Sequence, residues 1–572
     1  MNRAWRVKEK SNIKNIELEK KYHPLVLQLL ASRGLLEETE INNFFKPDYA
    51  TGIYDPFIFP DMGKAVERII RARESQEKVA IFGDYDADGV TSTAVLFEVL
   101  EKLGLKCAEI YIPDRQLEGY GMNIEAINFL QKKGITLIIT VDCGITNIEE
   151  VRQAGKLGID VIITDHHHVP EKIPEAFAII NPSGEESVYP FKNLAGVGVA
   201  FKLAQALCQK IEPEGIERLK WLLDLVAVGT IADCVPLIDE NRVIVKYGLV
   251  VLSKTRRQGL LEMFKVGRIM IDENNIPDTQ KIAFQISPRI NAAGRMDHAS
   301  VSFKLMIEKN TAVARDMALE VESKNQERQK VTAEIVREIR IVAENMYKDK
   351  KLIFVHNEHW QVGILGLVAG KIADEFNKPT VVLQKQDQEF VGSLRSIPQI
   401  NIIEALEKCS DLLIRFGGHA QAAGVRVAPG KIEKFYEKLS QIIEKELQGK
   451  DIIPEIEIDA EIKAQDINWD LVTELKKMEP FGEGNVEPVF LMKEMLIQDL
   501  RIVGNGSKHL KLALRPKDGS PKIFDAIGFG FGDKLPDLKN GDLIDIVFNL
   551  QEDEWNGNKK IQLKLIDLKV IK

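Results

Sequence analysis

Short, wholly apolar runs alternate with amphipathic stretches through the first half of the chain. The runs predict strands at 79–82, 107–112, 136–141, 161–164 and 178–180, and the stretches between them predict helices at 90–103, 123–133 and 148–157. Continuous apolar runs rich in β-branched residues are typical of strands that are covered on both faces. The alternation therefore predicts an α/β fold built on a mostly parallel sheet.

Helical patterns dominate the middle of the chain. Apolar residues at helical spacing predict a pair of helices at 196–210 and 215–232. Residues 311–348 contain no proline or glycine, and charged residues separate their helix-spaced apolar positions. This pattern predicts a long solvated helix that connects two domains.

The chain after residue 350 divides into a second α/β unit and a region of short strands. The second unit has predicted strands at 352–355 and 380–383, with a glycine-rich turn and helix, VGILGLVAGKIADEF, between them. Five short strands then follow, at 495–503, 509–514, 522–528, 543–550 and 562–568. Their spacing predicts a small barrel that best matches an OB-fold. Aromatic candidates for base stacking on it are Phe524, Phe529, Phe531 and Trp555.

A length of 572 residues allows three or four domains. We expect a helical N-terminal extension at 1–48, a first α/β domain at 49–308, a connecting helix at 309–349, a second α/β domain at 350–450 and the barrel at 451–572. No apolar run is long enough to span a bilayer, and the N-terminus lacks the apolar core of a signal peptide.

Cysteine usage and charge narrow the functional class. The five cysteines are scattered without a C-x-x-C pair, which indicates a reducing cytoplasm and argues against a disulfide framework or structural zinc. The net charge of -9 means that a nucleic-acid partner would require a locally basic groove.

Acidic and imidazole side chains directly follow three of the predicted strands. They are Asp84, Asp86 and Asp88 after the first, Asp142 after 136–141, and Asp165, His166, His167 and His168 after 161–164. Each group alone has an ordinary explanation, as a solvated turn, a helix N-cap or a surface histidine cluster. Because the carboxyl ends of parallel strands meet at one edge of a sheet, we expect the groups to converge there. Carboxylates that converge need a neutralising cation or water, so the pattern predicts a site for a hard metal ion.

Three later segments carry further candidates. Asp233 ends a strongly apolar helix, where its charge needs a partner such as a metal unless it reaches the surface. The segment SPRINAAGR places two arginines and Asn291 among small residues, which suits a phosphate or a carboxylate. The segment FGGHAQAAG allows close backbone approach to a ligand, although tight packing of a helix on a sheet explains it equally well.

The motifs GDYDADG, VDCG, TDHHH, GTIADCVPL and SPRINAAGR stand in the order found in the DHH phosphoesterases. The chain most resembles the branch of that family formed by single-strand-specific 5′→3′ exonucleases. GGHAQAAG is similar to the signature of the DHH-associated domain, and PFGEGNVEPVF and EWNGNKKIQL resemble the family's barrel region. The resemblance covers most of residues 50–572. It implies a DHH parallel-sheet domain joined by a long helix to a second α/β DHH-associated domain, followed by an OB-fold β-barrel.

The resemblance also implies a set of metal ligands. Asp86 and Asp88 resemble ligands of two separate metal ions, and Asp142 resembles a ligand that bridges both. His166 and Asp233 resemble further ligands of the second ion. Carboxylate and imidazole ligands at an open site suit Mn²⁺ or Mg²⁺, with Mn²⁺ favoured by the histidine.

Other motif positions resemble catalytic or supporting residues. His167 resembles the histidine that faces the scissile phosphate, while Asp84 and Asp165 resemble supporting residues, of which Asp84 can also ligate a metal. Phe82 stands where the small-phosphatase branch has a histidine, which leaves the first metal with one fewer ligand. Val486 stands in place of a proline near the barrel, a minor departure.

The implied reaction is hydrolysis of single-stranded DNA from its 5′ end, with release of nucleoside 5′-monophosphates, in DNA recombination and repair. Two metal ions roughly 3.5–4 Å apart can share a hydroxide and stabilise both oxygens of an in-line displacement. We expect the substrate to be held in a cleft between the two α/β domains, too narrow for duplex. The candidates for its lining are Arg115, Arg289, Asn291, Arg295, Ser393, Arg395, Ser396 and His419.

Two other functions stay open at this point. A DHH phosphodiesterase acting on short oligonucleotides or cyclic dinucleotides would share the motifs, but such proteins usually end before the barrel. A catalytically silent nucleic-acid-binding relative would have degenerate ligand positions, whereas the candidate ligands are all present here. The resemblance implies a single-strand-binding protein and a RecQ-type helicase as partners, with no membrane, and a monomer is the default.

Overall fold

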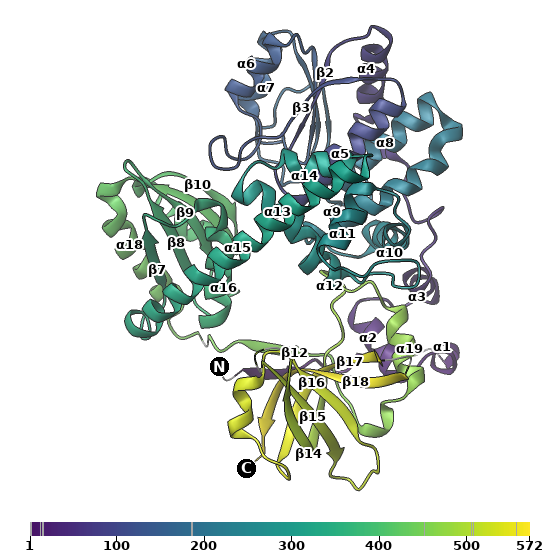
Figure 1. The fold of residues 1–572 in the computed structure, drawn as a ribbon, viewed down its shortest axis with the longest axis vertical. Coiled ribbons are helices and arrows are strands. Elements are labelled where there is room, and N and C mark those ends of the chain that lie inside the picture. The colour runs from purple at the N-terminus through teal and green to yellow at the C-terminus, as the bar shows by residue number, and fades with distance from the viewer. Residues whose placement is uncertain are drawn as a thin grey trace. The chain divides into compact units, whose positions relative to one another are not determined.

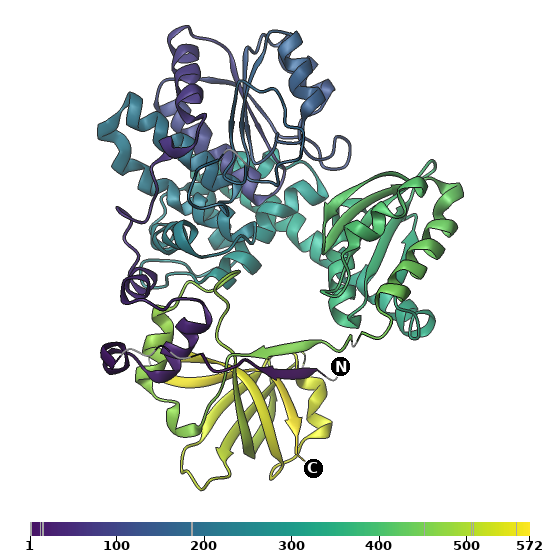
Figure 2. The same cartoon turned by 180° about the vertical axis from the view of Figure 1, so that it is seen from behind.

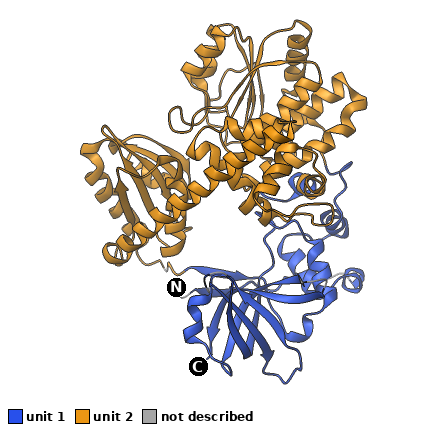
Figure 3. Cartoon of the chain, in the orientation of Figure 1, with its two compact units in different colours: residues 1–52, 236–243, 454–572 blue, residues 53–235, 244–453 orange. Residues whose placement is uncertain are grey.

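The computed structural model describes residues 3–11, 13, 16–184, 187–450, 452–504, 506, 508–555 and 558–571. The chain forms two compact units (Figure 3). Unit 1 comprises residues 1–52, 236–243 and 454–572, and unit 2 comprises residues 53–235 and 244–453. Within the described residues, no helix is both long enough and apolar enough to cross a membrane.

The first sheet of unit 2 is entirely parallel. Its strand order is β3 (Cys107–Tyr111), β2 (Val79–Gly83), β4 (Leu137–Val141), β5 (Asp160–Thr164) and β6 (Ala178–Ile180). Every residue of β2 and β4 is buried, as expected for strands covered on both faces. The five strands predicted from apolar runs are confirmed.

Helices cover both faces of this sheet (Figures 1 and 2). On one face, α6 (Ile124–Lys132) and α7 (Ile148–Lys156) contribute Ile127, Leu130 and Val151 to a core with the strand residues Ile138 and Val161. On the other face lie α4 (Met62–Glu74), α5 (Ala87–Lys102) and α8 (Gly196–Ile211). The predicted helices at 90–103, 123–133, 148–157 and 196–210 are therefore confirmed.

The helical region that follows differs from expectation at one point. The helix predicted at 215–232 is a 3₁₀ segment, η2 (Pro213–Leu222), followed by α9 (Leu223–Ala232). Pro213 and Gly215 explain the difference, because neither residue favours the interior of an α-helix. The other helices here are α10 (Asp239–Ser253), α11 (Gln258–Val266), α12 (Thr279–Lys281) and α14 (Ser300–Ile307).

Two helices link the first sheet to the second. The segment SPRINAAGR belongs to α13 (Ser287–Met296), which continues from a π-helical turn, η3 (Ile282–Ile286). The long solvated helix predicted at 311–348 is α15 (Thr311–Met346), capped by the Asn310 side chain. Helix α13 packs against α15, so the segment SPRINAAGR lies between the region of the first sheet and the connecting helix.

The second sheet of unit 2 is mixed. Its order is β10 (Leu413–His419), β11 (Ala422–Val427), β9 (Phe390–Arg395), β8 (Thr380–Lys385) and β7 (Ile353–Asn357), of which only β7 and β8 pair in parallel. The helices around it are α16 (Val362–Phe376), α17 (Ile402–Glu407) and α18 (Ile432–Glu446).

One expectation about a glycine-rich segment is wrong. VGILGLVAGKIADEF contains no turn, because all of it forms α16. Its first glycine serves close packing, since a Cβ on Gly363 would lie 2.2 Å from the Arg295 carbonyl oxygen. FGGHAQAAG forms the β10–β11 hairpin, and α17 packs against both of its strands.

Five strands of unit 1 close on themselves. They are β14 (Phe490–Val503), β15 (His509–Pro516), β16 (Phe524–Gly528), β18 (Asn558–Val570) and β17 (Leu543–Trp555), and β17 pairs back with β14. This ring of pairings confirms the predicted small barrel. Of the aromatic candidates on it, Phe524 is buried and Phe529 is 55% exposed, Phe531 packs against the core, and the Trp555 side chain lies outside the described residues.

The N-terminal segment differs from a purely helical extension. It begins with a strand, β1 (Ala4–Val7), which pairs in parallel with β12 (Glu455–Ile458). The helices α1 (Ile16–Lys21), α2 (Pro24–Ser32) and α3 (Glu38–Phe45) follow. Leu29 and Leu30 of α2 pack in the same core as Phe490 and Phe548 of the barrel. The remaining elements of unit 1 are β13 (Ala460–Glu461) and α19 (Trp469–Lys477).

Candidate functional site

Backbone N–H groups hold two carboxylates of the turn between β2 and α5 in place. Asp86 is the N-cap of α5, and its Oδ1 accepts hydrogen bonds from the N–H groups of Asp88 (2.9 Å) and Gly89 (3.0 Å). The buried Asp88 accepts from Gly196 N (2.7 Å) and Val197 N (2.9 Å) at the start of α8. Two helix N-termini therefore meet at this turn and favour negative charge there.

Side chains from three other elements reach the same place. Asp142 follows β4 with a left-handed backbone (φ 61°), a conformation that is uncommon outside functional sites and turns. His166 follows β5, and Asp233 is the C-cap of α9. The Nε2 atom of His166 lies 3.2 Å from Asp142 Oδ1, 3.5 Å from Asp233 Oδ2 and 3.9 Å from Asp88 Oδ2.

These side chains form three sets whose ligand atoms lie within 4.8 Å of one another. The sets are Asp84 with Asp86 and Asp142, Asp88 with His166 and Asp233, and Asp142 with His166 and His167. Asp142 belongs to two of the sets and joins the first to the second through its contact with His166. The structure thus brings together all six residues that the sequence marked as candidate ligands.

Three donor atoms of this cluster lack hydrogen-bond partners within the described part of the chain, and its carboxylates raise one another's pKa values. Asp84 Oδ1, Asp142 Oδ1 and His166 Nε2 are buried without a hydrogen-bond partner among the described residues. Burial and then the neighbouring carboxylates raise the pKa of Asp142 well above its usual range, and raise the pKa of Asp233 to about 9. A divalent cation would satisfy these atoms and offset the repulsion, and their oxygen and imidazole chemistry fits Mn²⁺ or Mg²⁺.

The pKa values of the two neighbouring histidines shift in opposite directions. Burial lowers the pKa of His166 to about 4, which leaves its imidazole neutral and able to ligate a metal. Burial also disfavours charge on His167, but its hydrogen bond to Asp165 outweighs this and raises the pKa of His167 to about 9. His167 Nδ1 lies 2.8 Å from Asp165 Oδ1, and Asp165 is fully buried and accepts from Ile145 N as well. The pair is therefore an imidazolium held by a fixed carboxylate.

Three arginines gather beside this cluster without acidic partners. Arg295 of α13 donates to the Gly363 carbonyl (3.3 Å), Arg395 ends β9, and Arg115 lies 4.7 Å above the Tyr85 ring. Burial, and then the charge of Arg115, lower the pKa of Arg295 to about 9 and lower the pKa of Arg395. Within the described part of the chain, no carboxylate lies in ion-pair distance of these three guanidinium groups. They form a site that a phosphate would complete.

The other residues predicted to bind substrate, Ser393, Ser396 and His419, differ in their contacts. A Cβ on Gly366 would touch both Ser393 and Arg395, so these two side chains face α16 together. Strand pairing aligns Arg395 with Ala422, and Ala422 with the exposed His419, on adjacent strands. Ser396 Oγ is bound to the Ile400 carbonyl (2.8 Å).

Two residues of α13 have protein partners at their polar atoms. Asn291 Oδ1 accepts from Ala87 N (2.7 Å) and so fixes the start of α5. Arg289 Nε pairs with Glu322 of α15 at 2.6 Å. Both contacts tie α13 to its neighbours, whereas Arg295 leaves its guanidinium beside the unpaired arginines.

Two further residues at this site, Tyr120 and Gly196, are not predicted from the sequence. The Tyr120 hydroxyl lies 3.0 Å from His167 Nδ1 and 3.2 Å from the Asp142 carbonyl oxygen. Gly196 is required because a Cβ there would lie 2.4 Å from Asp142 Oδ1. The G-x-G at the start of the 196–210 helix is a usable signal for this close approach, whereas nothing local marks Tyr120.

Phe82 occupies the position of the missing histidine. Its ring is fully buried and stacks on Tyr111, with centroids 5.0 Å apart and planes at 19°. The side chain belongs to the core of the first sheet, so it does not reach the carboxylates.

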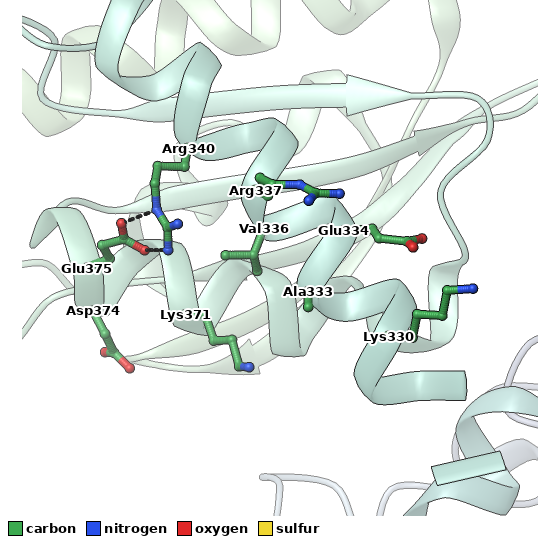
Figure 4. Close-up of a pocket in the computed structure, with 9 residues that line it drawn as sticks. All are labelled: Lys330, Ala333, Glu334, Val336, Arg337, Arg340, Lys371, Asp374 and Glu375. Atoms are coloured by element: carbon green, nitrogen blue, oxygen red, sulfur yellow. Dashed lines mark hydrogen bonds and ion pairs between the residues drawn. The ribbon is translucent and has the colours of Figure 1, made fainter. Parts of the chain in front are cut away.

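A separate groove lies between α15 and α16 (Figure 4). It is lined by Lys330, Ala333, Glu334, Val336, Arg337, Arg340, Lys371, Asp374 and Glu375. Arg340 Nη2 pairs with Glu375 Oε2 at 2.8 Å, and the remaining lining residues mix both charges. No predicted site residue lines this groove, which distinguishes it from the carboxylate cluster.

Removing divalent cations is expected to make the free energy of unfolding fall as the pH rises from 7 to 9. In the metal-free protein the pKa values of Asp233 and His167 are about 9, so the folded state keeps protons that the unfolded chain releases. A raised pKa gives stability that is present at low pH and lost as the pH rises through the folded value. Urea denaturation at pH 7, 8 and 9 measures this slope with EDTA and with Mg²⁺.

Saturating Mg²⁺ should reduce the dependence of the free energy of unfolding on pH. At a Mg²⁺ concentration of 100 times its dissociation constant, the free energy of unfolding should increase by about 2.7 kcal/mol. Equal slopes with EDTA and with Mg²⁺ would contradict a metal site at these residues.

Comparison with known proteins matches three segments of the chain to described domain families. Residues 78–230 match the DHH family N-terminal domain, residues 349–445 match the DHHA1 domain, and residues 458–567 match the RecJ OB domain. The matches cover the first sheet, the second sheet and the barrel. The OB-fold interpretation of the barrel is thereby confirmed.

Two relatives that match nearly all of this chain are both named single-stranded-DNA-specific exonuclease RecJ. The chain is 38% identical to the single-stranded-DNA-specific exonuclease RecJ of Bacillus subtilis, over 99% of this chain and 71% of that protein. It is 33% identical to the exonuclease of the same name from Haemophilus influenzae, over 95% of this chain and 96% of that protein. The crystal structure of RecJ from Thermus thermophilus in complex with Mn²⁺ is similar with a TM-score of 0.82 and 26% identity, over 99% of this chain and 79% of that one.

Proposed function

This chain belongs to the RecJ family of single-stranded-DNA-specific exonucleases, and we propose that it degrades single-stranded DNA from the 5′ end. The observation that carries the proposal is the pairing of a carboxylate–histidine cluster with three unpaired arginines in one unit. The cluster fits divalent cations, and the arginines fit a terminal phosphate. Hydrolysis at the first phosphodiester would then release a nucleoside 5′-monophosphate.

The metal-binding roles follow the three sets of ligand atoms. Asp86 and Asp84 would hold one Mn²⁺ or Mg²⁺ ion, Asp88, His166 and Asp233 would hold the other, and Asp142 would contact both. When bound, two such ions activate water and neutralise charge that develops on the phosphate. The cluster includes Asp84 directly, which supports a ligand role for it alongside Asp86.

His167 is positioned to act on the phosphate itself. Its Nδ1 is engaged by Asp165, which holds the imidazole in one orientation and favours its protonated form. Its Nε2 proton would stabilise negative charge on the phosphate oxygens or assist the departing 3′ oxygen. Asp165 would therefore act through His167 and not on the substrate.

The arginines would hold the 5′ phosphate and define the starting end. Arg115, Arg295 and Arg395 come from three different segments, so the anion site forms only when the two sheets of unit 2 are placed together. Ser393, beside Arg395, and His419, in register with it, would complete the pocket. For Arg289 and Asn291 the contacts with Glu322 and Ala87 favour a supporting role.

Replacing Arg395 by alanine is expected to raise KM for a 5′-phosphorylated strand about 10- to 100-fold, because a hydrogen bond between charged groups is lost. A 5′-hydroxyl strand should be affected less. Steady-state kinetics on both substrates measures the difference. Arg426→Ala is the matched control, since Arg426 lies on the neighbouring strand β11 and pairs with Glu389 at 2.7 Å. Equal KM values for Arg395→Ala and wild type would exclude this phosphate site.

A digestion assay tests the proposed function as a whole. Single-stranded and duplex DNA of equal length, labelled at either end, would be incubated with Mn²⁺. Mononucleotides released only from the 5′ ends of single strands would support the proposal. Turnover of dinucleotides without cleavage of long strands would point instead to the short-oligonucleotide branch of the DHH family.

The resemblance also suggests working partners. A monomer that cooperates with a single-strand-binding protein and a RecQ-type helicase would receive unwound strands with accessible 5′ ends. Light scattering on the purified protein measures the oligomeric state, and stimulation of DNA digestion by either partner tests the cooperation.

A further inference from the structure

An exposed phenylalanine lies on the helical segment that carries Arg295. Phe284 is 77% exposed, whereas Ile282 and Ile286 on either side of it are fully buried. All three belong to η3, the π-helical turn that continues into α13. Single π-helical turns within α-helices are frequent at functional sites. Because burying a phenylalanine side chain is worth roughly 1.5–3 kcal/mol, an exposed ring can gain this energy from a ligand.

Helical periodicity places Phe284 on the same side as Arg295. Ile286, Ile290 and Ala293 are buried at helical spacing and define the side that packs on the core. Successive residues advance about 100° around a helix, which puts Arg295 opposite that side. Phe284 is two residues from each of the buried isoleucines of η3, so it also faces away from the core. Phe284 and Arg295 therefore lie on the same side of the η3–α13 helix, which we call the outer stripe.

The outer stripe leads from the proposed phosphate site toward the ring. Phe284 and Arg295 are eleven positions apart, which corresponds to about 16 Å along a helix. Arg295 touches Gly363 at the start of α16, so the outer stripe faces the second α/β region at that end. A strand whose 5′ phosphate lies at the arginines would meet Phe284 several nucleotides downstream.

The residues next to Phe284 in the sequence include polar and charged side chains. Lys281 lies one turn earlier, and its Nζ donates to the Met270 carbonyl (3.2 Å). Gln280, which precedes Lys281, and Gln285, which follows Phe284, are polar and exposed. An exposed ring on the same side of the helix as Arg295 suits a base of a strand whose phosphate the arginines hold, because a base can stack on an aromatic face.

We propose that Phe284 is a stacking platform for a nucleobase of the single-stranded substrate, downstream of the scissile phosphodiester. The inference rests on the proposed exonuclease function and adds a subsite to it. Every base has a π-face, so the contact is independent of sequence. Bases of a duplex are already stacked and paired, so the platform would also favour single strands.

Replacing Phe284 by alanine is expected to lower kcat/KM for a long 5′-phosphorylated strand roughly 5- to 100-fold, the range of one base–aromatic contact. Phe284→Trp should retain most of the wild-type value, because indole also stacks. Met346→Ala, which removes another exposed apolar side chain at the end of α15, should be without effect. A 5′-phosphorylated dinucleotide is too short to reach the ring and should be cleaved equally by wild type and Phe284→Ala.

A strand with one abasic nucleotide, moved stepwise from the 5′ end, identifies the base concerned. Wild type should lose affinity at one position, and Phe284→Ala should show no further loss there. Equal kcat/KM for wild type and Phe284→Ala on long strands would overturn the platform, as would an abasic penalty that is the same in both proteins. If wild type cleaves no strand at all, the proposed function itself fails, which is a separate result.

Discussion

Replacing Asp142 by asparagine is expected to lower kcat on single-stranded DNA by roughly 10³-fold or more. Asp142 belongs to two sets of ligand atoms and lies 3.2 Å from His166, so the substitution weakens both proposed metal positions at once. Metal ions contribute several kcal/mol of transition-state stabilisation, and each 1.36 kcal/mol is tenfold in rate. Initial rates with Mn²⁺, together with the metal content of the purified variant, measure the effect.

A matched control separates metal loss from general damage. Asp297→Asn changes an exposed carboxylate that pairs with Lys324 at 3.2 Å, and it should keep the wild-type rate. The Asp142→Asn protein should melt no lower than metal-free wild type, because burial and the neighbouring carboxylates already disfavour charge at Asp142 and its Oδ1 has no hydrogen-bond partner among the described residues. A loss of kcat below tenfold, with normal metal content, would contradict the bridging role.

Replacing His167 by alanine is expected to lower kcat about 10²- to 10⁴-fold while leaving metal binding nearly unchanged. This range is typical for the loss of a positioned acid or charge-stabilising group. His167 is held by Asp165 and carries positive charge at neutral pH, whereas the neutral His166 faces the carboxylates. Rates on single-stranded DNA and Mn²⁺ titration of the same preparations test both parts.

The sequence offers a close control for His167. His168→Ala removes the exposed third histidine of the same tripeptide and should have little effect on the rate. Asp165→Asn should reproduce part of the His167→Ala loss, because Asp165 accepts from His167 Nδ1 and holds the imidazole in place. If His167→Ala lowers the metal content as much as Asp142→Asn does, His167 is a ligand and not the residue that faces the phosphate.

The comparison of Arg295 with Arg289 shows how far a motif can guide assignment. Both arginines stand in SPRINAAGR, six residues apart, and the motif does not distinguish between them. On α13 they point in different directions, because six residues turn a helix through about 240° after full rotations. Arg289 meets Glu322, while Arg295 joins Arg115 and Arg395. The motif locates the segment, and the helix phase separates the arginine that pairs with Glu322 from the arginine beside Arg115 and Arg395.

Local patterns in the chain are sufficient to predict the first sheet and the cluster of carboxylate and histidine side chains at its edge. Buried parallel strands are continuous apolar runs, and their carboxyl ends share one edge. Asp84, Asp86, Asp88, Asp142 and His166 each lie just after a strand, so their convergence follows without knowledge of distant contacts.

Features that depend on partners far apart in the chain emerge only from the folded molecule. No local signal marks the strand β1, because its partner β12 lies about 450 residues away. VGILGLVAGKIADEF suggests a turn because glycine disfavours helices, whereas α16 uses Gly363 to approach Arg295. Tyr120 and Gly196 belong to the site through contacts with His167 and Asp142. Local sequence indicates helix and strand propensity and the periodicity of apolar residues. Contacts between segments that are distant in the chain form only when both segments are folded.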